Sequence, residues 1–110
     1  MHTVAETPEF RAQAGRLLTD EETGRLISLL AHYPEAGDLI AGTGGFRKLR
    51  FARQGGGKRG GYRVVYFYCD ERLPVLLAAV YAKSDRDNLT KADRNALAEV
   101  AASIKQAIRR

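Results

Sequence analysis

The sequence predicts an α+β protein in which helices pack against an antiparallel β-sheet. Two observations support this fold class. Helix-capping motifs stand near both ends of the chain, and the middle third consists of strand-like segments separated by glycine-rich turns. A chain of 110 residues can bury one hydrophobic core, so we predict a single domain over residues 1–110. The predicted order is β-α-α-β-β-β-α, and the last three strands form a meander.

The N-terminal part is predicted to hold one strand and two helices: a strand over residues 2–5, a helix from residue 8 to about residues 15–18, and a helix from residue 20 to just before residue 34. In the first helix, Thr7 stands at the N-cap and Pro8 at the first helical position, where the missing N–H of proline does no harm. In the second helix, Thr19 and Glu22 form a capping box, and Pro34 stops the helix.

The remaining predicted elements are three strands and one helix: strands over residues 46–53, 62–69 and 75–81, and a helix that Thr90 caps. Gly37 to Gly45 has the composition of a loop, and Gln54 to Gly61 contains five glycines, which is typical of a hairpin tip. Val75 to Tyr81 is continuously apolar, and this pattern predicts a central strand that is covered on both faces.

Several classes of protein are excluded by composition. Cys69 is the only cysteine, so an internal disulfide and a multi-cysteine zinc site are excluded. The longest apolar run, Val75 to Ala82, is too short to span a bilayer. Because Glu6 and Glu9 stand near the start and no apolar segment follows them, we expect no signal peptide. A cytoplasmic protein without membrane contact is the simplest expectation.

Positive charge is concentrated in one segment. The net charge is +5, yet all 13 acidic residues lie outside Leu39 to Cys69. That segment carries seven basic residues: Arg47, Lys48, Arg50, Arg53, Lys58, Arg59 and Arg63. A charge run is often only a solvated face. Here the clustering without a single acid favours a polyanionic partner, because such a partner neutralises the repulsion between the cations.

Other motifs do not support a cofactor or a metal. Gly55 to Lys58 lacks the preceding glycine and the following hydroxyl residue of a phosphate-binding loop. His2 and His32 are not paired by spacing, and we interpret both as solvated or capping residues. Asp85 and Asp87 could form half of a metal site, but basic neighbours favour ion pairs instead. We therefore expect no metal ion and no cofactor.

Four cations on the predicted strands suggest a catalytic site: Lys48, Arg50, Arg63 and Lys83. Lys48 and Arg50 share one face of a strand, and a meander can bring the other two cations to the same side. Such a site suits the attack of a ribose 2′-hydroxyl on the adjacent phosphate. That reaction needs an in-line geometry, stabilisation of the phosphate charge and proton transfer, but no metal and no protein nucleophile. The simpler alternative is that all four cations only bind backbone phosphates.

Blocks of sequence along nearly the whole chain also carry a family resemblance. They are Glu6-Thr7-Pro8-Glu9-Phe10, Gly42-Thr43-Gly44-Gly45-Phe46-Arg47-Lys48-Leu49-Arg50, Gly57-Lys58-Arg59-Gly60-Gly61-Tyr62-Arg63-Val64-Val65-Tyr66, and Tyr81-Ala82-Lys83 with Leu89-Thr90. In these blocks the chain resembles the RelE/HigB toxins of bacterial toxin–antitoxin pairs. The resemblance implies a RelE-like microbial RNase fold, binding in the ribosomal A site, cleavage of the mRNA there, and neutralisation by a helix-turn-helix antitoxin.

The resemblance also implies roles for individual residues. The family's basic strand pair falls on Lys48 and Arg50, and its Gly-Tyr-Arg arginine, which would contact the scissile phosphate, falls on Arg63. The basic residue that closes the last strand falls on Lys83. RelE proper has a C-terminal tyrosine in its site, whereas this chain has no tyrosine after Tyr81. This difference favours the HigB-like branch of the family.

The leading hypothesis is a metal-independent endoribonuclease, an mRNA interferase that inhibits translation on the ribosome. Further contacts to mRNA and rRNA are predicted for the other cations near the site: Arg47, Arg53, Lys58, Arg59 and Arg86. Two alternatives stay open. One is a ParE-type inhibitor of DNA gyrase with the same fold, and the other is a non-catalytic RNA- or ribosome-binding module.

Overall fold

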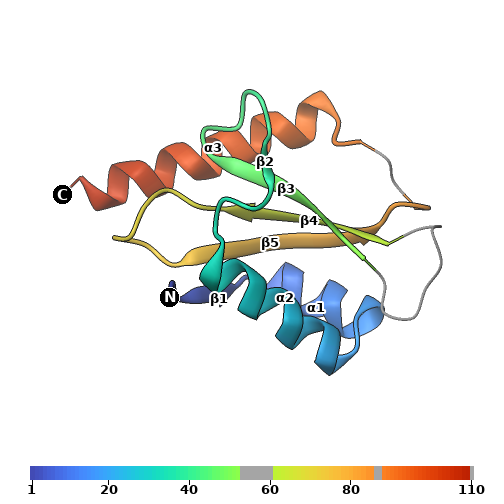
Figure 1. The fold of residues 1–110 in the computed structure, drawn as a ribbon. Coiled ribbons are helices and arrows are strands. Elements are labelled where there is room, and N and C mark those ends of the chain that lie inside the picture. Colours follow the sequence, from blue (N-terminus) through green and yellow to red (C-terminus); the bar gives the residue numbers. More distant parts are fainter. Residues whose placement is uncertain (53–60, 86–87, 110) are drawn as a thin grey trace.

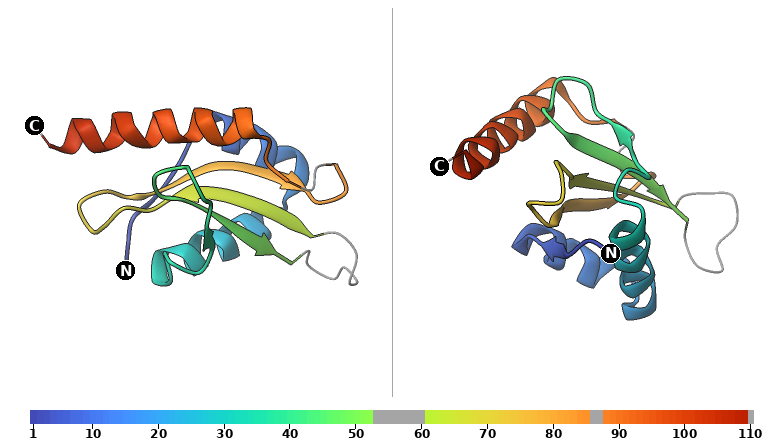
Figure 2. Two further views of the ribbon diagram at one scale, coloured as in Figure 1. Left: turned by 90° about the horizontal axis from the view of Figure 1, so that it is seen from above. Right: turned by 60° about the vertical axis from the view of Figure 1, so that its left-hand side comes forward.

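The computed structural model describes residues 1–52, 61–85 and 88–109. Within these ranges, five strands form one sheet in the order β1-β5-β4-β3-β2. Helices α1 and α2 lie on one face of the sheet and α3 lies on the other (Figures 1 and 2). The bounds of the elements are β1 Val4–Glu6, α1 Pro8–Leu17, α2 Asp20–His32, β2 Asp38–Leu39, β3 Phe46–Phe51, β4 Tyr62–Phe67, β5 Val75–Ala82 and α3 Lys91–Ile108.

The predicted α+β fold is confirmed, including the antiparallel meander of β3, β4 and β5. Two features of the sheet differ from the prediction. The first strand pairs in parallel with β5, so the sheet is mixed rather than wholly antiparallel. A two-residue strand, Asp38–Leu39, lies within the predicted loop Gly37 to Gly45 and pairs with β3. Two residues are too few to show the alternating pattern of a strand, so the sequence could not predict this one. It is a strand only because it pairs with β3.

Each helix begins where its cap predicts. Thr7 accepts a hydrogen bond from the Phe10 amide at 3.1 Å, and its hydroxyl donates to the Ala78 carbonyl at 3.2 Å. The capping boxes of α2 (Thr19 and Glu22) and of α3 (Thr90 and Asp93) have both reciprocal bonds. None of the helices in the described part of the chain combines the length and the apolar character that crossing a membrane requires.

The face of the sheet beneath α1 and α2 holds the larger core. Phe10 of α1 and Leu26 and Leu30 of α2 are fully buried against side chains of β3, β4 and β5. Tyr66 lies at the edge of this core with its hydroxyl hydrogen-bonded, and burial raises the pKa of that hydroxyl. The hydroxyl therefore keeps its proton at ordinary pH and can donate a hydrogen bond.

Tyr66 also fixes the segment that leads into β2. Its hydroxyl donates to the Pro34 carbonyl and accepts from the Gly37 amide, both at 2.8 Å. Gly37 is required at this approach, because a Cβ there would lie 2.9 Å from the Tyr66 ring and 3.0 Å from the Lys48 carbonyl. The result is a β2 register in which Asp38 lies opposite Lys48.

The other face, beneath α3, is only partly covered. Phe46, Val65 and Phe67 are buried there against Ala101 of α3. The prediction that β5 is covered on both faces is therefore only half right. Its residues facing α1 and α2 (Val75, Leu77 and Val80) are buried, whereas those facing α3 (Leu76, Ala79 and Tyr81) are half-buried. The single helix α3 covers less of its face of the sheet than the two helices α1 and α2 cover of the opposite face.

Candidate functional site

Three cations of the predicted catalytic set, Lys48, Arg50 and Arg63, meet on the α3-facing side of the sheet. Because side chains alternate along a strand, Lys48 and Arg50 of β3 project from the same face. The register of β3 and β4 places Arg50 directly opposite Arg63, and Lys48 opposite Val65, a residue of the core under α3. Three of the four predicted catalytic cations are therefore neighbours on one face.

A surface hollow of about 420 Å³ lies at this point. The described residues that line it are Ala36, Asp38, Lys48, Leu49, Arg50, Arg63 and Asn88. They come from the loop before β2, from β2, β3 and β4, and from the segment before α3. The hollow is thus built by three parts of the chain that are distant in sequence.

Arg50 and Arg63 form a cross-strand pair of like charge. Arg63 is only 8% exposed. Within residues 1–52, 61–85 and 88–109, neither of these arginines nor Lys48 forms an ion pair with a carboxylate. Like charges directly opposite each other destabilise a sheet, and a buried charge without a counterion is costly. An anionic ligand removes both costs, so this geometry favours binding of an anion such as a phosphate.

Two lining residues, Asp38 and Asn88, escaped the sequence analysis. Asp38 is the only carboxylate among the described residues that line the hollow, and it lies opposite Lys48 across the β2–β3 pair. The sequence offers no signal for it, since it stands in a segment with the composition of a loop. Asn88 lies two residues before the Thr90 cap of α3, a place where a polar residue is ordinary.

The fourth predicted catalytic residue, Lys83, is not brought into the hollow. It follows the end of β5, its side chain is exposed, and its amide donates to the Gly61 carbonyl at 3.3 Å. Tyr81 occupies the β5 position directly opposite Arg63. Tyr81 is half-buried on the same face, so an aromatic ring borders the cationic site.

Arg47, predicted to bind RNA, lies on the opposite face of β3. Its guanidinium donates to the Gly37 carbonyl at 2.8 Å and lies 3.5 Å from the Glu35 carboxylate. Arg47 therefore fixes the position of the segment before β2 through these two contacts. The other residues predicted to bind RNA, namely Arg53, Lys58, Arg59 and Arg86, lie outside the described residues.

The fold and the hollow define a small α+β protein with a cluster of basic residues on one face of its sheet. A family model described as the RelE toxin of the RelE/RelB toxin–antitoxin system matches residues 11–110. The chain belongs to the RelE toxin family, and it is the toxin component of a toxin–antitoxin pair.

Proposed function

We propose that this toxin is a ribosome-dependent endoribonuclease of the HigB-like branch, which cleaves mRNA in the ribosomal A site and so inhibits translation. The observation that carries the proposal is the opposition of Arg50 and Arg63 beside Lys48, on one sheet face and around one hollow. A site built at a cost in charge repulsion suits a substrate with phosphates.

The proposed reaction is attack by a ribose 2′-oxygen on its own 3′-phosphate. The new O2′–P bond forms as the P–O5′ bond breaks, which gives a 2′,3′-cyclic phosphate and a free 5′-hydroxyl. A base takes the proton of the 2′-hydroxyl, and an acid gives a proton to the leaving 5′-oxygen. All atoms come from the RNA, so the protein needs to supply only orientation, positive charge and proton transfer.

The residues around the hollow supply these functions. We assign Arg63 and Arg50 to the nonbridging phosphate oxygens, because guanidinium forks bind such oxygens in pairs. Lys48, two residues from Arg50 on the same face, is assigned the proton transfer to the leaving oxygen. Asp38 is a candidate for the base, because it is the carboxylate that faces Lys48 across the hollow. Lys83, which lies outside the hollow, is assigned a contact to the RNA backbone.

Single-turnover cleavage on programmed ribosomes at saturating toxin tests the proposal. Lys48→Ala should lower the cleavage rate more than it lowers ribosome affinity, since a proton-transferring group contributes only in the transition state. Arg16→Ala serves as a matched control. Arg16 is an exposed cation near the end of α1, on the other side of the sheet. It should leave the cleavage rate and the affinity at their wild-type values.

Two results would contradict the proposal. Should Lys48→Ala, Arg50→Ala and Arg63→Ala all lose affinity but cleave normally at saturation, the hollow binds phosphates without catalysing their transfer. Should the wild-type toxin cleave nothing on translating ribosomes while DNA synthesis stops in cells, gyrase inhibition of the ParE type becomes the better explanation.

A further inference from the structure

The carboxylate assigned as the base of the proposed reaction stands in a strand of only two residues. Asp38 is the first residue of β2, and both residues of this strand are exposed. Burial in an apolar core therefore does not hold β2 in place. Pairing with β3 puts Asp38 opposite Lys48, but a functional side chain keeps one position only where its neighbours fix it. Asp38 needs such support from elsewhere in the molecule.

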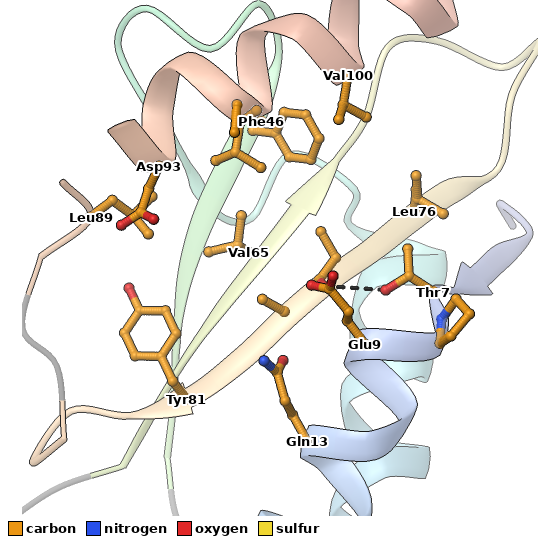
Figure 3. A pocket seen from close by; sticks show the side chains of 15 residues that line it. Thr7, Glu9, Gln13, Phe46, Val65, Leu76, Tyr81, Leu89, Asp93 and Val100 are labelled. Carbon is orange, nitrogen blue, oxygen red and sulfur yellow. Dashed lines mark hydrogen bonds between the residues drawn. The ribbon is translucent and has the colours of Figure 1, made fainter. Parts of the chain in front are cut away.

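The position of Asp38 matters because no other carboxylate in the described part of the chain lines the hollow. Two other acids, Glu9 and Asp93, line a neighbouring apolar groove of about 600 Å³ between the start of α1, the sheet and α3 (Figure 3). The groove adjoins the hollow in the segment before α3, where Leu89 lines the groove and Asn88 lines the hollow. Asp93 also accepts the reciprocal hydrogen bond of the α3 capping box. Asp38 is thus the acid that the hollow can present to a substrate.

The support for Asp38 comes from the other face of the sheet, beneath α1 and α2. The Tyr66 side chain is fully buried in that core, so close packing fixes the place of its hydroxyl. The hydroxyl donates to the Pro34 carbonyl and accepts from the Gly37 amide, both at 2.8 Å. Gly37 directly precedes Asp38, so these bonds fix the backbone from which the carboxylate projects.

Two further contacts hold the same segment. Arg47, which lies opposite Tyr66 in the β3–β4 pair, donates to the Gly37 carbonyl at 2.8 Å. The Gly37 backbone also lies so close to β3 that an added Cβ would be 3.0 Å from the Lys48 carbonyl. Gly37 is therefore held through its amide, its carbonyl and its α-carbon. Because the next residue pairs with Lys48, these contacts set the separation of the two groups assigned to proton transfer.

We propose that Tyr66 is a positioning residue, whose hydroxyl holds the backbone at Gly37 so that the Asp38 carboxylate faces Lys48 in the hollow. This inference rests on the proposed function, in which Asp38 takes the proton of the 2′-hydroxyl. Tyr66 does not reach the RNA, since it is fully buried beneath α1 and α2. Its contribution is to the orientation of Asp38, and orientation acts on the chemical step rather than on binding.

Single-turnover cleavage on programmed ribosomes tests this role. Tyr66→Phe should lower the cleavage rate at saturating toxin about tenfold, because the base loses its fixed geometry. The toxin concentration that gives the half-maximal rate should stay at its wild-type value. The loss should be smaller than the roughly hundredfold that a displacement of about 1 Å can cause, since Arg47 still holds the segment.

Tyr62→Phe is the matched control. Tyr62 stands on the same strand as Tyr66, faces the same core and donates its hydroxyl to the Leu17 carbonyl at 2.9 Å. Its bond is to the end of α1 rather than to the segment before β2. Tyr62→Phe should therefore also lower stability but should cleave at the wild-type rate. Assays at a temperature at which all variants are folded separate the rate from the stability.

Three more measurements distinguish positioning from a general loss of structure. In an Asp38→Asn background, Tyr66→Phe should cause no further loss of rate, because the group that it positions is already gone. Gly37→Ala, whose Cβ would press on the Tyr66 ring and the Lys48 carbonyl, should reproduce the loss with the Tyr66 hydroxyl intact. Hydrogen exchange of the Gly37 amide should become faster in Tyr66→Phe but not in Tyr62→Phe.

Several results would overturn the inference while the protein remains a nuclease. They are a wild-type cleavage rate in folded Tyr66→Phe or in Asp38→Asn, an equal loss of rate in Tyr62→Phe, and losses that multiply when Tyr66→Phe is combined with Asp38→Asn. Absence of cleavage by the wild type on translating ribosomes is a different result. It would overturn the proposed function, and with it the reaction for which Asp38 is positioned.

Discussion

The two faces of the sheet differ in how completely they are covered. On one face, α1 and α2 close over β3, β4 and β5, and thirteen buried residues of the described part of the chain form a continuous core. On the other face, α3 alone shares a buried core of four residues with the sheet. The closed face has the composition of a folding core, whereas the open face exposes apolar side chains next to three cations.

This difference separates stability from binding. The hydrophobic gain that holds the protein together comes mainly from the closed face, because burial there is complete. The open face carries features that cost stability, namely the Arg50–Arg63 opposition and half-exposed aliphatic residues. Features of this kind are retained where a ligand compensates for them. Mutations on the closed face should therefore mainly lower stability, whereas mutations of the cations on the open face should mainly lower activity.

The largest expected effect on stability is on the closed face. Leu26→Ala, at a fully buried position, should lower the free energy of unfolding by about 2–5 kcal/mol. Leu97→Ala, at a half-buried position beside the groove, should cost less than about 1.5 kcal/mol, because solvent already reaches its site. Urea denaturation of both variants measures the difference. Equal losses would mean that the two faces contribute alike to stability.

On the open face, Arg63→Ala should retain the fold but lose activity. Losing one preorganised charge contact typically costs about 3 kcal/mol in the transition state, or roughly a hundredfold in rate. Stability should be nearly preserved, since the substitution removes a repulsive pair as well as packing. Single-turnover cleavage and thermal unfolding are the two measurements. A folded variant that cleaves mRNA at the wild-type rate would show that Arg63 is not catalytic.

The link between the two faces is tested at Tyr66, which supports the segment that carries Asp38. Tyr66→Phe removes a hydroxyl with two hydrogen bonds and should lower the free energy of unfolding by about 1–3 kcal/mol. Tyr68→Phe is the matched control. No hydrogen bond within the described residues involves the Tyr68 hydroxyl, so Tyr68→Phe should change the free energy of unfolding by less than about 0.5 kcal/mol. Similar values for both variants would argue against the anchoring role of Tyr66.

The smallest expected effect distinguishes two arginines on opposite faces of β3. Arg50→Ala should weaken ribosome binding and lower the slope of log affinity against log salt by about one. Arg47→Ala should have a smaller effect on that slope, because its guanidinium is engaged with Glu35 and Gly37. Co-sedimentation with ribosomes over a range of salt concentrations measures both slopes. A larger change for Arg47 would place RNA on the α1 and α2 side.

Much of the fold was predictable because its signals are local. The caps at Thr7, Thr19 and Thr90 start the helices through hydrogen bonds within four residues of sequence. The meander follows from strand-like segments joined by short connections, which pair with their neighbours in sequence. The shared face of Lys48 and Arg50 follows from the two-residue period of a strand.

The rest depended on contacts between distant parts of the chain. Strand β2 exists because Tyr66 and Gly37 bring two residues alongside β3, and the parallel pairing of β1 depends on where the α1–α2 pair returns the chain. The same holds for the position of Asp38 in the hollow and for the structural role of Arg47.

The sequence by itself determined the three helices, four of the five described strands, the order of these elements, the basic segment and the face that two of its cations share. Only the tertiary structure decided that Arg50 opposes Arg63, that Lys83 stays outside the hollow, and that an apolar groove adjoins it. The physical reason is that composition and period constrain each segment separately. Register and the extent to which a helix covers a sheet depend on packing between segments, and a single strand carries no record of either.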